Sequence, residues 1–137
     1  MSEINQIKQD EGFRSTLYYC SLGKPTIGYG FNLKSGITEE EASAILAIRV
    51  NRITEELKAL LHWFPSLPDE VQGVLVNMAY QLGVSGTLKF TKTMNFAQSG
   101  EWDAMATEML RSGWAIQTPH RANRLAHRVR NVGSSDQ

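Results

Sequence analysis

The spacing of apolar residues at the start of the chain changes from a helical pattern to a strand-like one. Ile4 and Ile7 fall on one face of a short helix, and one turn further that face reaches Glu11. Two runs rich in β-favouring residues follow, 16–19 and 26–30, and the turn-forming segment SLGKP separates them. The pattern predicts an N-terminal helix that ends near a carboxylate, followed by a β-hairpin.

A capping box opens the longest predicted helix. Thr38 is followed three residues later by Glu41, and apolar positions continue at helical spacing to about residue 61. At ~1.5 Å per residue this helix spans roughly 35 Å, which is long enough to join two lobes. The same periodicity predicts further helices over 69–82, 88–99, 101–111 and 119–131, the last with Thr118 as its N-cap and Pro119 as its first residue.

These elements predict an α+β fold that is mostly α-helical. All 137 residues are expected to form a single domain with two lobes and a connecting helix. Its expected parts are a hairpin lobe at about 12–37, an interlobe helix at about 39–61, and a helical lobe at about 62–131 that also includes the N-terminal helix.

Charge and hydropathy limit the classes of partner. The formal net charge is zero, so nothing in the overall charge indicates nucleic acid. No acidic residue stands between Glu108 and Asp136, where several arginines fall, so this face either contacts an anionic partner or is simply solvated. The sequence shows neither a signal-peptide pattern nor an apolar run of membrane-spanning length, so we expect synthesis in the cytoplasm without membrane insertion.

Three side chains with useful chemistry lie close together in sequence around the hairpin: Glu11, Cys20 and Thr26. Since Cys20 is the single cysteine, no internal disulfide is possible. A zinc pair is not expected, because His120 and His127 are seven residues apart, whereas paired ligands on a helix are three or four apart. The sequence carries no phosphate-binding loop or nucleophile elbow, so neither a metal nor a cofactor is predicted.

The spacing of these residues resembles a known enzyme signature. Glu11, Cys20 and Thr26, followed at once by IGYG, resemble the E-x8-[DC]-x5-T signature of the phage-type lysozymes, glycoside hydrolase family 24. Four later blocks resemble the same family in the same order: ITEEEA, VNMAYQLGVSGTLKF, EWDAMATEMLRSGW and QTPHRANRLAHR. The family implies a two-lobed lysozyme fold with a peptidoglycan strand in the cleft between the lobes. Its members cleave the β-1,4 bond between N-acetylmuramic acid and N-acetylglucosamine.

The resemblance implies a role for each matching position. Glu11 resembles the general acid that protonates the glycosidic oxygen, and Thr26 the hydroxyl that helps to position the attacking water. Cys20 stands where many members have aspartate, and Arg121 resembles the arginine that pairs with the catalytic glutamate. The positions that resemble the substrate-binding groove are Gly30, Tyr80, Gln81 and Thr93. Two other groove positions, Asn32 and Glu108, depart from the family pattern and receive no role.

The mechanism predicted from this resemblance depends on the charge of Cys20. An aspartate in its place would be ionised, whereas a thiol with a reference pKa of ~8.5 is mostly neutral near pH 7 unless its site lowers that pKa. With a lowered pKa, Cys20 could replace the aspartate directly, near the water of an inverting hydrolysis, and this is our hypothesis. If the thiol stays neutral, catalysis would depend more on Glu11 and Thr26.

The chain is therefore predicted to be a bacteriolytic enzyme, a monomeric lysozyme that lyses host cells for phage release. Its expected partner is bacterial peptidoglycan, which it would reach through a holin-type membrane protein; endolysin, prophage and virion-associated settings all fit. Two alternatives remain open. One is a lytic transglycosylase that uses Glu11 as its sole acid and base and leaves an anhydro end, and the other is a non-catalytic module that binds the cell wall.

Overall fold

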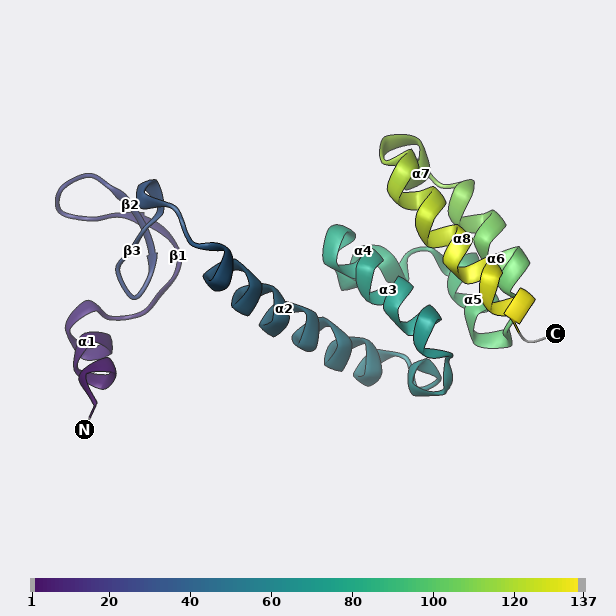
Figure 1. Cartoon of the computed structure of the whole chain (residues 1–137), viewed down its shortest axis with the longest axis horizontal. Helices are drawn as coiled ribbons and strands as arrows, with labels where there is room; N and C mark the ends of the chain where they lie inside the picture. Colours follow the sequence, from purple (N-terminus) through teal and green to yellow (C-terminus); the bar gives the residue numbers. More distant parts are fainter. Residues whose placement is uncertain (1, 136–137) are drawn as a thin grey trace. The chain divides into compact units, whose positions relative to one another are not determined.

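The computed structural model describes residues 2–135 and divides the chain into two compact units, Met1–Ile45 and Leu46–Gln137. The fold is α+β and mostly helical, as the sequence predicts, with strands only in the first of the described units (Figure 1). The predicted grouping of the N-terminal helix with the helical lobe concerns both units and stays a prediction.

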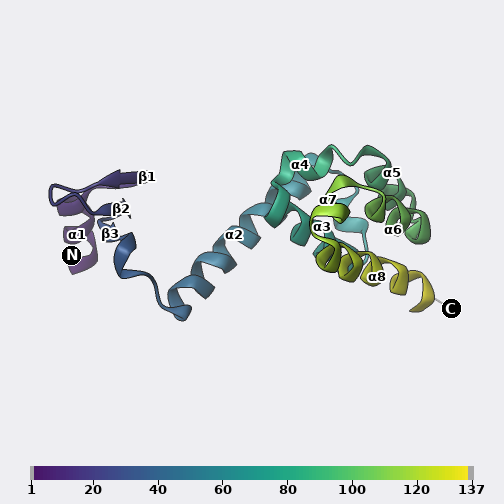
Figure 2. The ribbon, with the colours of Figure 1, turned by 90° about the horizontal axis from the view of Figure 1, so that it is seen from above.

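The first unit combines one helix with a small antiparallel sheet. Helix α1 (Glu3–Glu11) begins after Ser2, whose side chain accepts a hydrogen bond from the Asn5 amide, and it ends at Gly12. The strands are β1 (Arg14–Tyr19), β2 (Pro25–Gly28) and β3 (Phe31–Asn32), paired in the order β1-β2-β3 (Figure 2). The predicted hairpin corresponds to β1 and β2. Strand β3 has only two residues, which is too short to show an alternating pattern in sequence.

The turn between β2 and β3 depends on glycine. Gly28 and Gly30 have φ angles of 69° and 75°, a left-handed backbone that glycine adopts without strain. A Cβ atom on Gly28 would lie 2.7 Å from the ring of Phe31, so that ring lies directly on the glycine. In the middle strand, Thr26 pairs with Tyr18 of β1.

Helix α2 (Glu39–Leu60) begins with the predicted capping box, after the short 3₁₀ turn η1 (Leu33–Ser35). The Thr38 amide donates to Oε1 of Glu41 at 2.8 Å, and the Glu41 amide donates to the Thr38 hydroxyl at 3.1 Å. The hydrogen bonds from Thr38 lower the pKa of Glu41. The sequence thus predicted both the start of this helix and the contacts that fix it.

The second unit continues with short helices. They are η2 (Phe64–Ser66), α3 (Asp69–Leu82), α4 (Val84–Leu88), α5 (Thr91–Ser99), α6 (Trp102–Leu110), α7 (Gly113–Gln117) and α8 (Pro119–Ser135). Helix α8 packs along α6 and α3 (Figures 1 and 2). The helix predicted over 88–99 begins only at Thr91, because the backbone leaves the helical region at Phe90, where ψ is 68°. The short helix α4 before it was not predicted. Helix α7 was not predicted, and the Thr118 hydroxyl donates to the Trp114 carbonyl at its end.

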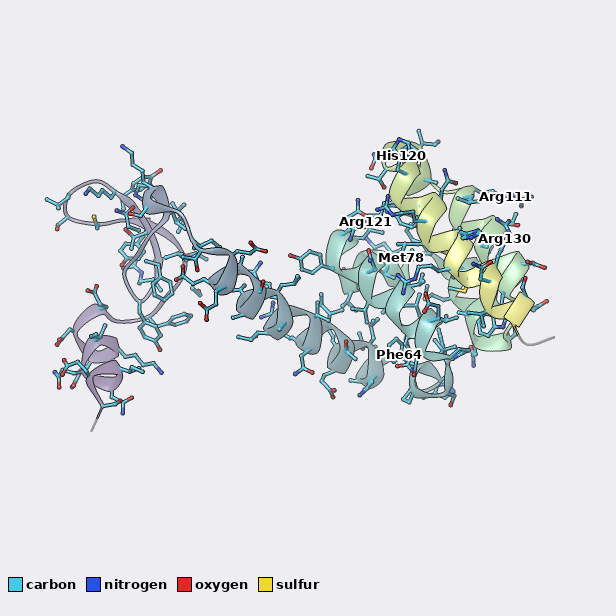
Figure 3. All side chains as sticks on the ribbon, in the orientation of Figure 1. Phe64, Met78, Arg111, His120, Arg121 and Arg130 are labelled. Atoms are coloured by element: carbon cyan, nitrogen blue, oxygen red, sulfur yellow. The ribbon has the colours of Figure 1, made fainter. Side chains whose placement is uncertain are left out.

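Apolar side chains from most of these helices form the core of the second unit. Its largest fully buried side chains include Phe64, Leu75, Met78, Met105, Met109 and Val129, of which Figure 3 labels Phe64 and Met78. Burying one such side chain contributes about 1.5–3 kcal/mol. This packing fixes the helices that carry the predicted groove residues and the predicted arginine. Among the described helices, none combines the length and apolar character that crossing a membrane requires.

Candidate active site

The carboxyl group of Glu11, the predicted acid, lies against Gly30. Glu11 is the last residue of α1, and Gly30 stands just before β3. A Cβ atom on Gly30 would lie 2.8 Å from Cδ of Glu11 and nearer still to its Oε2, so no larger side chain fits without moving the carboxyl group. Two of the predicted site residues are therefore in contact, and glycine is what allows the approach.

The ring of Tyr29 holds the end of α1 on this turn. The Lys8 ammonium lies 5.5 Å from the Tyr29 ring centroid, and the Phe13 ring packs on Tyr29 at a centroid distance of 5.6 Å. An exposed cation–π contact and an aromatic pair each contribute about 0.5–1 kcal/mol. Lys8 and Phe13 stand on either side of Glu11 in the chain, so these contacts restrict where its side chain can lie.

Cys20 and Thr26 are joined through the carbonyl of Lys24. Thr26 is only 4% exposed, and its hydroxyl donates to that carbonyl at 2.9 Å. The backbone amide of Cys20 donates to the same oxygen at 2.9 Å. The thiol of Cys20 also lies within hydrogen-bond reach of the Thr26 hydroxyl. The loop between β1 and β2 thus brings the predicted thiol and hydroxyl together.

The surroundings of Cys20 favour its charged form. Hydrogen bonds from the backbone amides of Lys24 and Leu22 lower the pKa of the thiol below its ordinary value. The Thr26 hydroxyl and the Lys24 charge lower the pKa further, while partial burial opposes the shift. A greater share of thiolate is therefore present near neutral pH than for a free cysteine.

In the second unit, Arg121 is held by an asparagine that the sequence did not single out. Its Nε and Nη2 donate to Oδ1 of Asn77 at 2.9 and 2.7 Å, and Nη2 also donates to the Asn77 carbonyl at 3.2 Å. The sequence did hold one indication of Asn77, because its polar amide stands in the middle of an otherwise apolar stretch of α3. The predicted pairing of Arg121 with Glu11 involves both units and stays a prediction.

The predicted groove residues of this unit lie on α3 and α5. Gln81 accepts a hydrogen bond at 2.9 Å from Nε1 of Trp114, a side chain that is 5% exposed. Trp114 and Thr93 line a cavity of about 620 Å³. Tyr80, one residue before Gln81, is exposed. Trp114 was not predicted to take part, because its role depends on a partner far away in the sequence.

The family model of the phage lysozymes matches residues 8–130 of the chain. The chain belongs to the phage lysozyme family. This match includes every predicted site residue from Glu11 to Arg121.

Two probable T4-type lysozymes of Dictyostelium discoideum, numbered 2 and 1, are relatives that the match covers along most of their length. They are 26% and 25% identical to this member of the phage lysozyme family, over 88% of its chain and 89% of theirs. The pre-baseplate central spike protein Gp5 of Enterobacteria phage T4 is 26% identical over 91% of this chain, which spans only 27% of Gp5. Related sequence therefore makes up most of some chains and only a part of a longer one.

Proposed function

We propose that this member of the phage lysozyme family is a peptidoglycan hydrolase that cleaves the β-1,4 bond between N-acetylmuramic acid and N-acetylglucosamine. The observation that carries the proposal is the Glu11 carboxyl group seated on Gly30, in the same unit as the joined Cys20 and Thr26. Glycoside hydrolysis needs one group that gives a proton and another that takes one, and this unit holds both.

In the proposed reaction, Glu11 donates its proton to the glycosidic oxygen as the bond to the anomeric carbon breaks. The Thr26 hydroxyl orients a water molecule on the opposite face of the sugar. The oxygen of this water bonds to the anomeric carbon, and its proton passes to the Cys20 thiolate. Attack from the opposite face inverts the configuration, and exchange with solvent then restores both groups.

The remaining predicted residues orient the acid and the substrate. Arg121 would orient Glu11, and Asn77 fixes the direction of the guanidinium through two of its oxygens. The groove that binds the glycan would include Gly30, Tyr80, Gln81 and Thr93. Trp114 supports this groove, since its indole N–H holds Gln81.

The products of purified sacculi test the reaction class. We expect mass spectrometry to find reducing N-acetylmuramic acid ends, because water adds to the cleaved bond. Anhydro ends would show a transglycosylase instead. Sacculi that stay intact while binding the protein would show a non-catalytic wall-binding module. The lowered pKa of Cys20 favours hydrolysis, because a thiolate can accept a proton from water.

The pH dependence of the rate tests the role of Cys20. Only the thiolate accepts a proton, so kcat/KM should rise as the pH rises through the thiol pKa. Because hydrogen bonds lower the pKa of Cys20, this rise should come at a lower pH than the pKa of a free cysteine. Cys20→Asp should move the rise toward the aspartate range near pH ~4, and Cys20→Ser should remove it and slow hydrolysis about 10²-fold or more. A Cys20→Ser enzyme with the wild-type rate and profile would contradict the proposed base.

The proposed setting is lysis of a bacterial host by a monomeric endolysin that depends on a holin-type membrane protein. The support for it is the family resemblance. Purified protein should then clear Gram-negative cells whose membranes chloroform has opened, and should leave untreated cells turbid. Clearing of untreated cells would contradict the need for a separate permeabilising partner.

A further inference from the structure

Strand pairing places Asn32 beside the Thr26 hydroxyl. In the sheet, Asn32 of β3 lies directly opposite Thr26 of β2. Residues that pair in this way project their side chains from the same face, with Cβ atoms about 4.5–5.5 Å apart. Gly30, against which the Glu11 carboxyl group lies, stands two residues before Asn32 in the chain. Asn32 is therefore a polar neighbour of the candidate site, although the sequence assigned it no role.

The orientation of the Asn32 amide is fixed by a hydrogen bond on its oxygen side. Oδ1 accepts from the backbone amide of Lys34 at 3.0 Å and so caps the 3₁₀ turn η1. Its NH₂ group carries two donors, and within residues 2–135 neither is used by a protein acceptor. Asn32 is half-buried, and no fully buried side-chain nitrogen or oxygen atom in this range lacks a partner, so the NH₂ group is within reach of water.

The Thr26 hydroxyl can only accept a hydrogen bond from a water molecule. A hydroxyl has one hydrogen and two lone pairs, and Thr26 gives its hydrogen to the Lys24 carbonyl at 2.9 Å. In the proposed hydrolysis, the attacking water thus donates one hydrogen to Thr26 and the other to the Cys20 thiolate. Neither of these two groups offers a donor to the oxygen of the water.

A water molecule held only through its two hydrogens can still rock about the line that joins them. This rocking swings the lone pairs of its oxygen, one of which must point at the anomeric carbon for the new bond to form. A donor on the second lone pair stops the rocking and sets the direction of the first. The free NH₂ group of Asn32 is a side-chain donor that strand pairing places next to Thr26.

We propose that Asn32 is a positioning residue for the hydrolysis: its NH₂ group donates a hydrogen bond to the attacking water and directs the reacting lone pair at the anomeric carbon. The inference rests on the proposed function, because the water nucleophile belongs to hydrolysis. No proton leaves Asn32, and the proton of the water still passes to the Cys20 thiolate. Asn32 therefore sets the geometry of the attack and supplies neither acid nor base.

Two substitutions keep the cap of η1 and remove the donor from the water. Asn32→Asp keeps the size of the side chain and the oxygen that accepts from Lys34, and an ionised carboxylate has no donor. Asn32→Ser keeps a capping oxygen without adding a charge, and its hydroxyl is too short to hold the cap and reach the water at once. With soluble peptidoglycan fragments, both should lower kcat about ten-fold and change KM by less than about two-fold, since the lost orientation affects the reacting state. The thermal unfolding midpoint should stay nearly unchanged, because the cap is kept.

The pH profile separates positioning from an effect on the base. Asn32→Ser should keep the pH at which kcat/KM rises, because it leaves in place the hydrogen bonds and the Lys24 charge that lower the pKa of Cys20. Asn5→Asp and Asn5→Ser are the matched controls, since Asn5 is exposed on α1 and its substitutions make the same changes of charge and size. Both controls should keep the wild-type kcat.

Wild-type kcat in both Asn32 variants would overturn the inference, and so would a raised KM with unchanged kcat, which would make Asn32 a sugar-binding residue. A shifted pH rise in the serine variant would overturn it as well, because the substitution would then act through Cys20. The ends that the wild type releases separate the two levels of failure. Reducing ends with unaffected Asn32 variants contradict this inference alone, and anhydro ends contradict the proposed function together with it.

Discussion

Substitution of Glu11 by glutamine should lower the rate of peptidoglycan hydrolysis by about 10³-fold. Glutamine keeps the size of the side chain and can still lie against Gly30, but its amide has no acidic proton to give to the glycosidic oxygen. Glu11 is exposed within its unit, so its replacement should leave the thermal unfolding midpoint nearly unchanged. The release of reducing ends from sacculi measures the first effect, and circular dichroism on heating measures the second.

Asp10→Asn is the matched control for this loss. Asp10 is the neighbouring carboxylate on α1, is also exposed, and loses the same charge on substitution. We expect it to keep most of the wild-type rate. If both variants lose the same share of the rate, the loss comes from the missing negative charge on α1. A Glu11→Gln enzyme that keeps more than about a tenth of the wild-type rate would contradict the role of Glu11 as acid.

Substitution of Gly30 by alanine should slow hydrolysis about 10²-fold without removing any catalytic group. The new Cβ would overlap the Glu11 carboxyl group, whose Cδ lies 2.8 Å away, and would move it from its place. A displacement of about 1 Å in a reacting group is enough for such a loss. The left-handed φ of 75° adds a stability cost of about 1–2 kcal/mol. Kinetics on sacculi and urea unfolding measure the two effects.

Gly36→Ala separates these two causes. Gly36 has a φ of 76°, but a Cβ atom there would meet nothing within 4 Å. It should therefore show a similar loss of stability and an almost unchanged rate. If both variants slow hydrolysis equally, the contact between Gly30 and Glu11 has no special part in catalysis.

Long helices with explicit end signals were the best predicted part of the fold. Helix α2 follows a capping box, and α3 runs between Asp69 and Leu82, as its periodicity and the glycine after it indicate. The elements that the sequence did not reveal are short. Strand β3 and helix α7 are too brief to show a period, and their hydrogen-bonding partners in the folded chain define them.

In the candidate site, too, the sequence revealed the residues that are close together in the chain. The spacing of Glu11, Cys20 and Thr26 indicated a catalytic group. Asn77 could not be found by spacing, since it stands 44 residues from the arginine that it holds. Trp114 also needed the structure, because the glutamine to which it donates stands 33 residues away in the sequence.

The sulfur atoms of the chain are distributed in a way that has a practical consequence. The single thiol lies half-buried in the first unit, whereas Met78, Met94, Met105 and Met109 are buried in the core of the second. A thiol-alkylating reagent therefore reports on the first unit, and oxidation of these four methionines reports on opening of the second. The two units can be followed separately in the unlabelled protein.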